Sequence, residues 1–155
     1  MDKTNVMKML DKKKIEYKGY TYGNGEAMSG TEVAKLIGKE ADAVFKTLVT
    51  VGKSGKNYVF VVPSSKELDL KKAAKAAGEK SIEMIKSKEL LPLTGYVHGG
   101  CSPIGMKKAF ATFIDSSAEN FETIVFSAGK IGFQVEMTLE NLSKMIRFDL
   151  SDISE

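Results

Sequence analysis

FKTLVTVGKSGKNYVFVVP, residues 45–63, carries the clearest structural signal in the chain. Two runs rich in β-branched and aromatic residues, Leu48–Val51 and Tyr58–Val62, flank the glycine-containing segment Gly52–Lys56. Such a pattern predicts a β-hairpin with one of the longer loops. We expect Pro63 to end the second strand, because proline has no N–H to donate to a neighbouring strand.

Outward from this hairpin, helices and strands are mixed without a regular βαβ rhythm. Helices are expected after Thr4, after a capping box at Ser29–Glu32, over Asp69–Ala77, over Lys86–Leu91 and after Thr138. Strands are expected over Ile15–Tyr22, Tyr96–His98, Thr112–Asp115, Thr123–Ser127 and Gly132–Met137. This mixture favours an α+β fold, with a mixed, largely antiparallel, curved sheet and surrounding helices in a single domain over residues 1–155.

Glycine and proline mark the expected ends of these elements. Gly38 and Gly78 should stop the second and third helices, Pro92 should interrupt the fourth, and Gly23–Gly25 should break the first strand. The buried stripe of the second helix is expected to be Val33, Leu36 and Ile37, and that of the last helix Leu139, Leu142, Met145 and Ile146.

The composition is that of a globular domain, with 155 residues, 43% apolar and 28% charged. No apolar run approaches the roughly 20 residues of a membrane-spanning helix, and no signal peptide follows Met1. A membrane protein is therefore excluded, and a cytoplasmic location is expected. Cys101 and His98 are the single cysteine and histidine, which excludes an internal disulfide and a closed zinc site of cysteine and histidine ligands. Neither a metal nor a cofactor is predicted.

The positive charge of the chain is carried by lysine. There are 23 lysine and arginine residues against 20 acidic ones, and Arg147 is the single arginine. Arginine is the usual reader of base edges, whereas lysine attracts phosphate as a point charge. Lysine that only keeps the surface soluble is the alternative interpretation, so charge alone does not identify a nucleic-acid-binding protein.

The segment Gly99–Gly105, GGCSPIG, is the most unusual stretch. Its glycines allow backbone N–H groups to converge on an anion or a developing oxyanion. A tight structural connection is an equally good interpretation. Cys101 within it suggests a nucleophile with His98 as base, but a half-buried thiol without a catalytic role is favoured. Lys46, at the head of an apolar strand, could hold a phosphate or a carbonyl oxygen, although a surface lysine fits the pattern better.

Five segments, taken together, closely resemble the YbaK/EbsC family of aminoacyl-tRNA deacylases, which is related to the editing insertion of bacterial prolyl-tRNA synthetases. They are VFKTL at 44–48, LDLKKAAK at 68–75, LTGY at 93–96, GGCSPIG at 99–105 and SAGK at 127–130. The likeness extends from about Thr4 to Ile153. It implies the fold of that editing domain and trans-editing hydrolysis of mischarged tRNA, above all cysteine on proline tRNA.

The resemblance also implies roles for individual residues. Lys46 matches the functional lysine of the family near the tRNA 3′ end, and Gly99 and Pro103 match the ends of its G-x-x-x-P loop. The intervening residues Gly100, Cys101 and Ser102 are counted with this catalytic loop, whose backbone amides hold the aminoacyl group. The predicted substrate-binding residues are Tyr22, Ser29, Thr47, Ser127, Gly129 and Gln134. Ser29 and Gln134 depart from the aromatic and the acid that some relatives carry, which leaves the amino-acid preference open.

In this family the thiol of the substrate cysteine is thought to attack its own carbonyl, so that few protein bases are needed. The implied partners are the acceptor end of a mischarged tRNA and prolyl-tRNA synthetase, with no membrane. Lysines at 71, 72, 75, 107 and 108 could meet tRNA phosphates. Two alternatives remain open: a non-catalytic module that binds charged tRNA or a synthetase, and a small-ester hydrolase that depends on Cys101.

Overall fold

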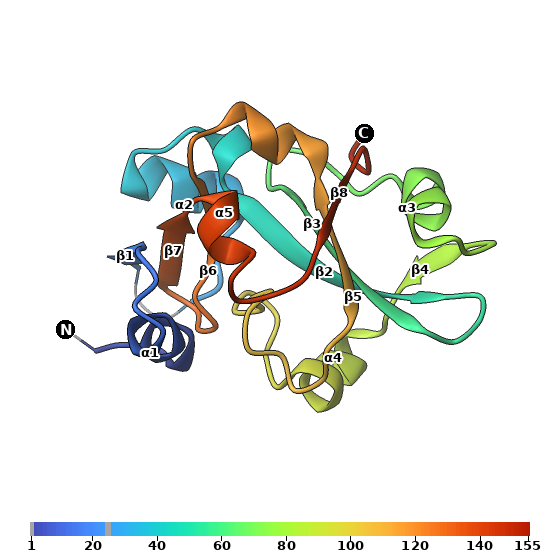
Figure 1. Cartoon of the computed structure of the whole chain (residues 1–155), viewed down its shortest axis with the longest axis horizontal. Coiled ribbons are helices and arrows are strands. Elements are labelled where there is room, and N and C mark those ends of the chain that lie inside the picture. The colour runs from blue at the N-terminus through green and yellow to red at the C-terminus, as the bar shows by residue number, and fades with distance from the viewer. Residues whose placement is uncertain (1, 24–25) are drawn as a thin grey trace.

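The predicted hairpin forms the centre of the computed structural model, which describes residues 2–23 and 26–155 (Figure 1). Its strands are β2 (Phe45–Gly52) and β3 (Asn57–Pro63), paired antiparallel. The other strands are β1 (Lys18–Thr21), β4 (Ile82–Met84), β5 (Ala111–Asp115), β6 (Ile124–Ser127), β7 (Phe133–Met137) and β8 (Asp149–Ser151). The α-helices are α1 (Asn5–Lys12), α2 (Gly30–Ile37), α3 (Leu70–Ala77), α4 (Ser87–Thr94) and α5 (Leu139–Leu142), and two 3₁₀ turns are η1 (Ala41–Ala43) and η2 (Ser116–Asn120).

The described strands form two sheets. The larger has five strands in the order β4-β2-β3-β5-β8, in which β3 pairs parallel with β5 and β5 with β8. The smaller has the order β1-β7-β6, and both of its pairs are antiparallel. An isolated parallel bridge between Val44 and Val125 links the start of β2 to β6. The predicted α+β class is confirmed, but the expected single curved sheet is divided at this bridge.

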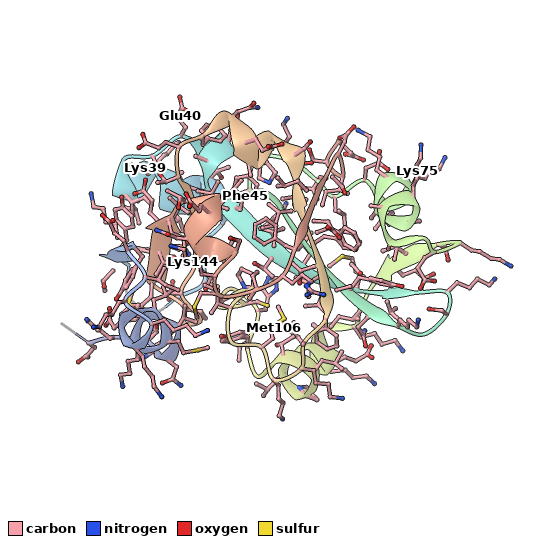
Figure 2. All side chains as sticks on the ribbon, in the orientation of Figure 1. Lys39, Glu40, Phe45, Lys75, Met106 and Lys144 are labelled. Atoms are coloured by element: carbon pink, nitrogen blue, oxygen red, sulfur yellow. The ribbon has the colours of Figure 1, made fainter. Side chains whose placement is uncertain are left out.

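Both faces of the hairpin are covered. Val59 and Val61 pack in a core shared with α1 and the small sheet, whereas Phe60 and Val62 pack with α3 on the opposite face. All four of these β3 side chains are fully buried. A strand covered on both faces has a continuous apolar run rather than an alternating pattern, which explains the sequence of β3. Figure 1 shows the two coverings at opposite ends of the molecule, and Figure 2 shows Phe45 in its interior.

Capping residues begin and end the helices as predicted. The Ser29 hydroxyl accepts the N–H of Glu32 at 3.2 Å, and the Glu32 carboxylate accepts the N–H of Ser29 at 3.2 Å, which completes a capping box. Asp69 accepts the first N–H groups of α3. Gly38 and Gly78 end α2 and α3 with φ of 73° and 72°, a left-handed conformation that glycine adopts without steric cost.

Two strand predictions are corrected by the backbone hydrogen bonds. The strand expected over Ile15–Tyr22 is shorter and begins at Lys18, because the N–H of Ile15 donates to the Leu10 carbonyl and closes the end of α1. Tyr96–His98 forms no strand, because the N–H of Gly100 donates to the carbonyl of Val97 and folds this segment into a turn. The short strands β4 and β8 carry no comparable sequence pattern.

The helix predictions also need corrections. α4 continues through Pro92 to Thr94, because its last turn is closed by the N–H of Gly95, which donates to the Leu91 carbonyl at 2.8 Å. In α2, Leu36 is 56% exposed instead of buried, and Ala34 joins Val33 in the core.

The last helix is shorter than expected. Thr138 caps α5 as predicted, but the helix ends at Leu142. Met145 lies in the turn that follows, and Ile146 lies just after that turn. The predicted break at Gly23–Gly25 falls partly on Asn24 and Gly25, which lie outside the described residues. Among the described residues, no helix combines the length and the apolar character that crossing a bilayer requires.

A buried carboxylate ties the C-terminal segment to the large sheet. Asp115, at the end of β5, accepts the N–H groups of Ile153 and Ser154 at 3.0 and 3.1 Å and also the Ser117 hydroxyl. Burial alone would raise the pKa of Asp115, but the hydrogen bonds from Ser117 and Ile153 outweigh it, so the pKa is lowered. The ionised carboxylate therefore stabilises the folded state.

Asp115→Asn should lower the free energy of unfolding by roughly 1.5–3 kcal/mol at pH 7, the range for a hydrogen bond to a charged group. Because folding lowers the pKa, the advantage of the wild type is present above the ordinary value of 3.8 and decreases as the pH falls through the lower folded value. Urea unfolding between pH 7 and pH 3 measures this difference. Asp149→Asn, which removes an exposed carboxylate on β8, is the matched control. An equal difference at pH 7 and pH 3 would contradict the assignment.

Candidate functional site

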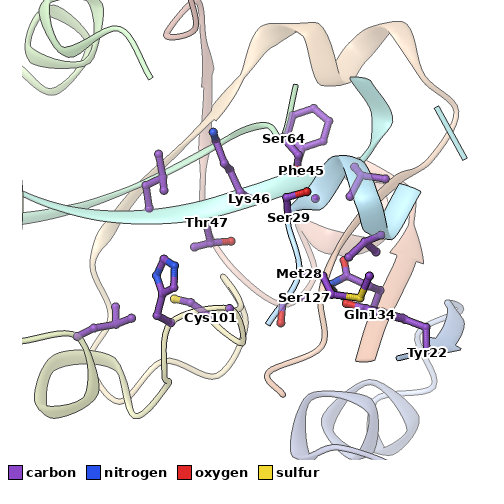
Figure 3. A pocket seen from close by; sticks show the side chains of 17 residues that line it. Tyr22, Met28, Ser29, Phe45, Lys46, Thr47, Ser64, Cys101, Ser127 and Gln134 are labelled. Carbon is purple, nitrogen blue, oxygen red and sulfur yellow. Dashed lines mark hydrogen bonds between the residues drawn. The ribbon is translucent and has the colours of Figure 1, made fainter. Parts of the chain in front are cut away.

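A cavity of about 230 Å³ lies where the two sheets meet, beside the first residues of β2 (Figure 3). Its wall comes from the start of β2, the first turn of α2, the loop after α4, and the facing ends of β6 and β7. Pockets for drug-sized ligands have volumes of roughly 300–1,000 Å³, so this cavity suits a smaller group.

Most of the predicted site residues line this one cavity, although they come from distant parts of the chain. These residues are Tyr22, Ser29, Lys46, Thr47, Gly99, Cys101, Ser127 and Gln134. Four others do not line it. Gly100 packs against the backbone of Lys130 and Ile131, Ser102 and Pro103 are buried behind the wall, and Gly129 borders a separate cleft beside α1.

β2 presents the adjacent polar residues Lys46 and Thr47 to opposite sides. Successive side chains of a strand point to opposite faces, and Figure 3 shows Lys46 and Thr47 extending in opposite directions from β2. The Lys46 ammonium lies 3.7 Å from a carboxylate oxygen of Glu67, and 30% of the lysine side chain is exposed. Since Glu67 is 79% exposed, this is a weak surface ion pair that leaves the ammonium available to a ligand.

The glycine-rich loop forms part of the wall but uses some of its amides internally. The N–H of Gly100 donates to Val97, and the N–H of Ile104 donates to the Ser102 hydroxyl. Within the described part of the chain, the N–H groups of Gly99 and Cys101 have no hydrogen-bond partner, and both residues line the cavity. The N–H groups of Ser102 and Gly105 are also unpaired within the described chain, but these residues do not line the cavity, so Gly99 and Cys101 supply the candidate loop donors for a ligand.

Cys101 and His98 both line the cavity, but they do not form a reactive pair. Burial raises the pKa of the Cys101 thiol from 9.0 to about 12, so the thiol is protonated at neutral pH. Among the described residues, no hydrogen bond joins the two side chains. Such a thiol is a poor nucleophile, which favours the interpretation of Cys101 as a half-buried wall residue.

The far wall of the cavity is polar and uncharged. The Gln134 amide donates from Nε2 to the Tyr22 hydroxyl at 3.1 Å, and the Ser127 hydroxyl accepts the N–H of Gly129 at 3.1 Å. Burial raises the pKa of Tyr22, with an opposing effect of the bond from Gln134, so the phenol is neutral. The Ser29 hydroxyl belongs to the capping box and is occupied there.

Three buried side-chain oxygen atoms have no hydrogen-bond partner in the described structure, and all three belong to residues of this cavity. They are Thr47 Oγ1, Ser64 Oγ and Gln134 Oε1. Buried polar atoms are nearly always paired, so these three atoms are free to bond a ligand or a water in the cavity. Thr47 and Gln134 were predicted from the sequence. Ser64 was not, because a serine after a strand carries no signal of its own.

The charge of the cavity is set by Lys46, since the described wall contains no aspartate or glutamate. Within residues 2–23 and 26–155, no group of three or more His, Cys, Asp or Glu side chains has a metal-binding arrangement. The described wall can therefore offer one cation, two backbone donors, and several neutral donors and acceptors. This set suits a small polar ligand attached to an anionic or oxygen-rich group.

Comparison with known proteins gives a consistent result. A sequence profile of the aminoacyl-tRNA editing domain matches residues 25–145. The chain is 44% identical over 153 residues to the Enterococcus faecalis protein named "Putative Cys-tRNA(Pro)/Cys-tRNA(Cys) deacylase EbsC", covering 98% of this chain and 93% of that protein. It is 29% identical over 108 residues to a Shouchella clausii "Proline--tRNA ligase", covering 70% of this chain and 19% of the ligase.

Among solved structures, the crystal structure of "a putative trans-editing enzyme for prolyl tRNA synthetase" matches with a TM-score of 0.80. The match covers 90% of this chain and 87% of the other, at 24% sequence identity. At this level of identity, the likeness establishes the shared fold.

Alkylation of Cys101 by iodoacetamide at pH 7.5 should be at least roughly 100-fold slower in the folded protein than in the urea-unfolded chain, because burial suppresses the thiolate. Mass spectrometry of quenched samples measures both rates on the same single cysteine. Comparable rates in the two states would mean that Cys101 is an accessible, activated thiol.

Proposed function

The chain belongs to the aminoacyl-tRNA editing domain family, and we propose that it is a trans-editing deacylase whose main substrate is cysteine mischarged on proline tRNA. The cavity carries this proposal, because it combines Lys46 with two free loop amides and an uncharged polar wall in a volume suited to one aminoacyl group. The resemblance to EbsC extends the proposal to cysteinyl-tRNA of the correct pairing.

The reaction proposed for this protein requires only a modest lowering of the activation barrier. An aminoacyl ester is an activated acyl group, so donors that stabilise negative charge on its carbonyl oxygen contribute much of the required acceleration. In the proposed mechanism the amides of Gly99 and Cys101 bind this oxygen, and the Lys46 ammonium binds the 3′-terminal nucleotide. One oxyanion-hole donor is worth roughly 100- to 1,000-fold in rate.

The thiol of the substrate supplies the nucleophile. Its sulfur forms a bond to the carbonyl carbon of the same residue, the bond from that carbon to the tRNA 3′ oxygen breaks, and the thiol proton is transferred to this leaving oxygen. The products are uncharged tRNA and a cyclic thioester, which water then opens to free cysteine. This route explains how the reaction proceeds without a thiolate or a carboxylate base in the described wall.

Proposed partners are the acceptor end of tRNA and prolyl-tRNA synthetase, in the cytoplasm. Lys71, Lys72 and Lys75 lie on α3, and Figure 2 shows Lys75 projecting from the periphery of the molecule. Together with Lys107 and Lys108 they offer phosphate contacts whose strength would fall as salt rises, and the Lys72 ammonium also bonds Asp152 at 3.1 Å and the Ser154 carbonyl at 2.9 Å. We propose that selection of proline tRNA depends on the synthetase, because lysines give no base reading.

Lys46→Ala should lower the rate of cysteine release from mischarged proline tRNA by roughly 100-fold or more, the effect of losing a charge that positions the reacting group. Lys3→Ala is the matched control, since Lys3 also forms an exposed ion pair, with Asp11, away from the cavity. Hydrolysis of 3′-end-labelled charged tRNA measures the rates. Full activity of Lys46→Ala would reject the assigned role. Absence of any ester loss with the wild type would favour a non-catalytic binding module.

Cys101→Ala should retain most of the wild-type deacylation rate, because the loop contributes its backbone and the protonated thiol takes no part. The same charged-tRNA assay measures this, with circular dichroism to verify folding. A folded but inactive Cys101→Ala protein would instead support the cysteine-dependent hydrolase.

A further inference from the structure

Ser64 makes an unusually close contact with the first turn of α2. A Cβ placed on Gly30 would lie 1.8 Å from Ser64 Oγ and 2.2 Å from Ser64 Cβ, whereas the Ser64 Cα would be 3.6 Å away. Gly30 lies in an ordinary helical conformation, so its backbone angles do not require glycine. Among the described residues, the Ser64 side chain is the neighbour that requires glycine at this position.

The hydroxyl brought so close to α2 has no partner. Ser64 Oγ is buried and forms no hydrogen bond to any part of the described chain, yet Ser64 lines the cavity. A buried hydroxyl without a hydrogen-bond partner destabilises the folded protein. The first turn of α2 thus keeps a glycine beside a hydroxyl that no described residue satisfies, which leaves this hydroxyl as a hydrogen-bonding group for a ligand in the cavity.

The hairpin register places Ser64 on the side of Lys46. The N–H of Ser64 donates to the Val44 carbonyl at 2.7 Å, which extends the β2–β3 pairing one residue beyond Pro63. Residues paired across strands share a face, as do residues two apart along a strand. Val44, Ser64 and Lys46 therefore share one face of the hairpin, and Thr47 is on the other.

We propose that Ser64 is a further substrate-binding residue, whose hydroxyl hydrogen-bonds the ribose of the 3′-terminal nucleotide beside Lys46. This inference rests on the proposed function and divides the cavity into two parts. The side with Lys46 and Ser64 holds the nucleotide, and the side with Tyr22 and Gln134 holds the amino acid. A serine hydroxyl both donates and accepts, as a ribose hydroxyl does, so either direction of the bond is possible.

Ser64→Ala separates binding from stability. The variant should unfold at the same temperature as the wild type or higher, because it removes an unsatisfied hydroxyl. It should lose roughly 3- to 10-fold in kcat/KM, the effect of one neutral hydrogen bond. The loss of affinity should be equal for non-hydrolysable 3′-aminoacylamino analogues of adenosine that carry cysteine, alanine or serine, because their binding needs no substrate thiol. A rate equal to that of the wild type would overturn the proposal, and a loss confined to one amino acid would overturn the assignment to the nucleotide.

A compensating pair tests whether the contact is only packing. Gly30→Ala should destabilise the protein through the clash with Ser64. Adding Ser64→Gly removes the two atoms that clash, so the double variant should regain stability while lacking the hydroxyl. We expect the double variant to remain as impaired in kcat/KM as Ser64→Ala. Recovery of wild-type catalysis would show that Ser64 serves packing alone and would overturn the proposal.

Binding of a non-hydrolysable substrate analogue tests the role of Ser64 without any need for catalysis. Calorimetry with 3′-deoxy-3′-(alanylamino)adenosine, whose amide replaces the labile ester, should show the same loss of affinity for Ser64→Ala. If the wild type binds the analogue but hydrolyses no charged tRNA, the proposed function fails, and the affinities alone decide the role of Ser64. If the wild type does not bind the analogue, both proposals are overturned.

Discussion

Burial of the β2–β3 hairpin on both faces is the constraint on which the rest of the structure depends. The side chains of β3 reach two separate cores, one built with α1 and the small sheet and the other with α3. A shift of register by one residue would exchange these two sets of side chains, so the register is strongly specified. The same alternation sends Lys46 and Thr47 to opposite sides of β2. The chemistry of the cavity is therefore a consequence of how the hairpin is packed.

The cavity exists because the edge of β2 that faces away from β3 is paired near its start and near its end, but not in the stretch between. Val44 forms a bridge to β6, and pairing with β4 begins at Thr50. The cavity borders the stretch between these two contacts and takes its other walls from α2 and the glycine-rich loop. The buried oxygens of Thr47, Ser64 and Gln134 remain unpaired around it. The proposed substrate carries an activated ester, and for such a reaction orientation and a few fixed dipoles supply much of the rate.

Features that depend on a few adjacent residues were predicted correctly from the sequence. Features that depend on contacts between distant segments were not. The capping box at Ser29 and the glycine stop at Gly78 involve residues within one turn of each other, and both were confirmed. Leu36 fits the apolar stripe of α2 but is exposed, because the position of α2 on its core decides which side is covered. For the site, the position of Lys46 at the head of a strand made it a candidate, but preference for a functional role, and the choice of Gln134, came through resemblance to a family. Ser64 was not predicted as a site residue, because its proposed role depends on contact with Gly30, which is distant in the sequence.

By itself, the amino-acid sequence determined the hairpin, most helix caps and the α+β class, because these follow from backbone conformations and apolar patterns within a few residues. It also contained the five segments that identify the family. Tertiary structure alone decided the division into two sheets, the burial that keeps Cys101 protonated, and the meeting of Ser64 with Gly30. These features arise where segments distant in sequence exclude water from one another. Burial, hydrogen-bond satisfaction and pKa depend on all the surrounding groups, so no short stretch of sequence specifies them.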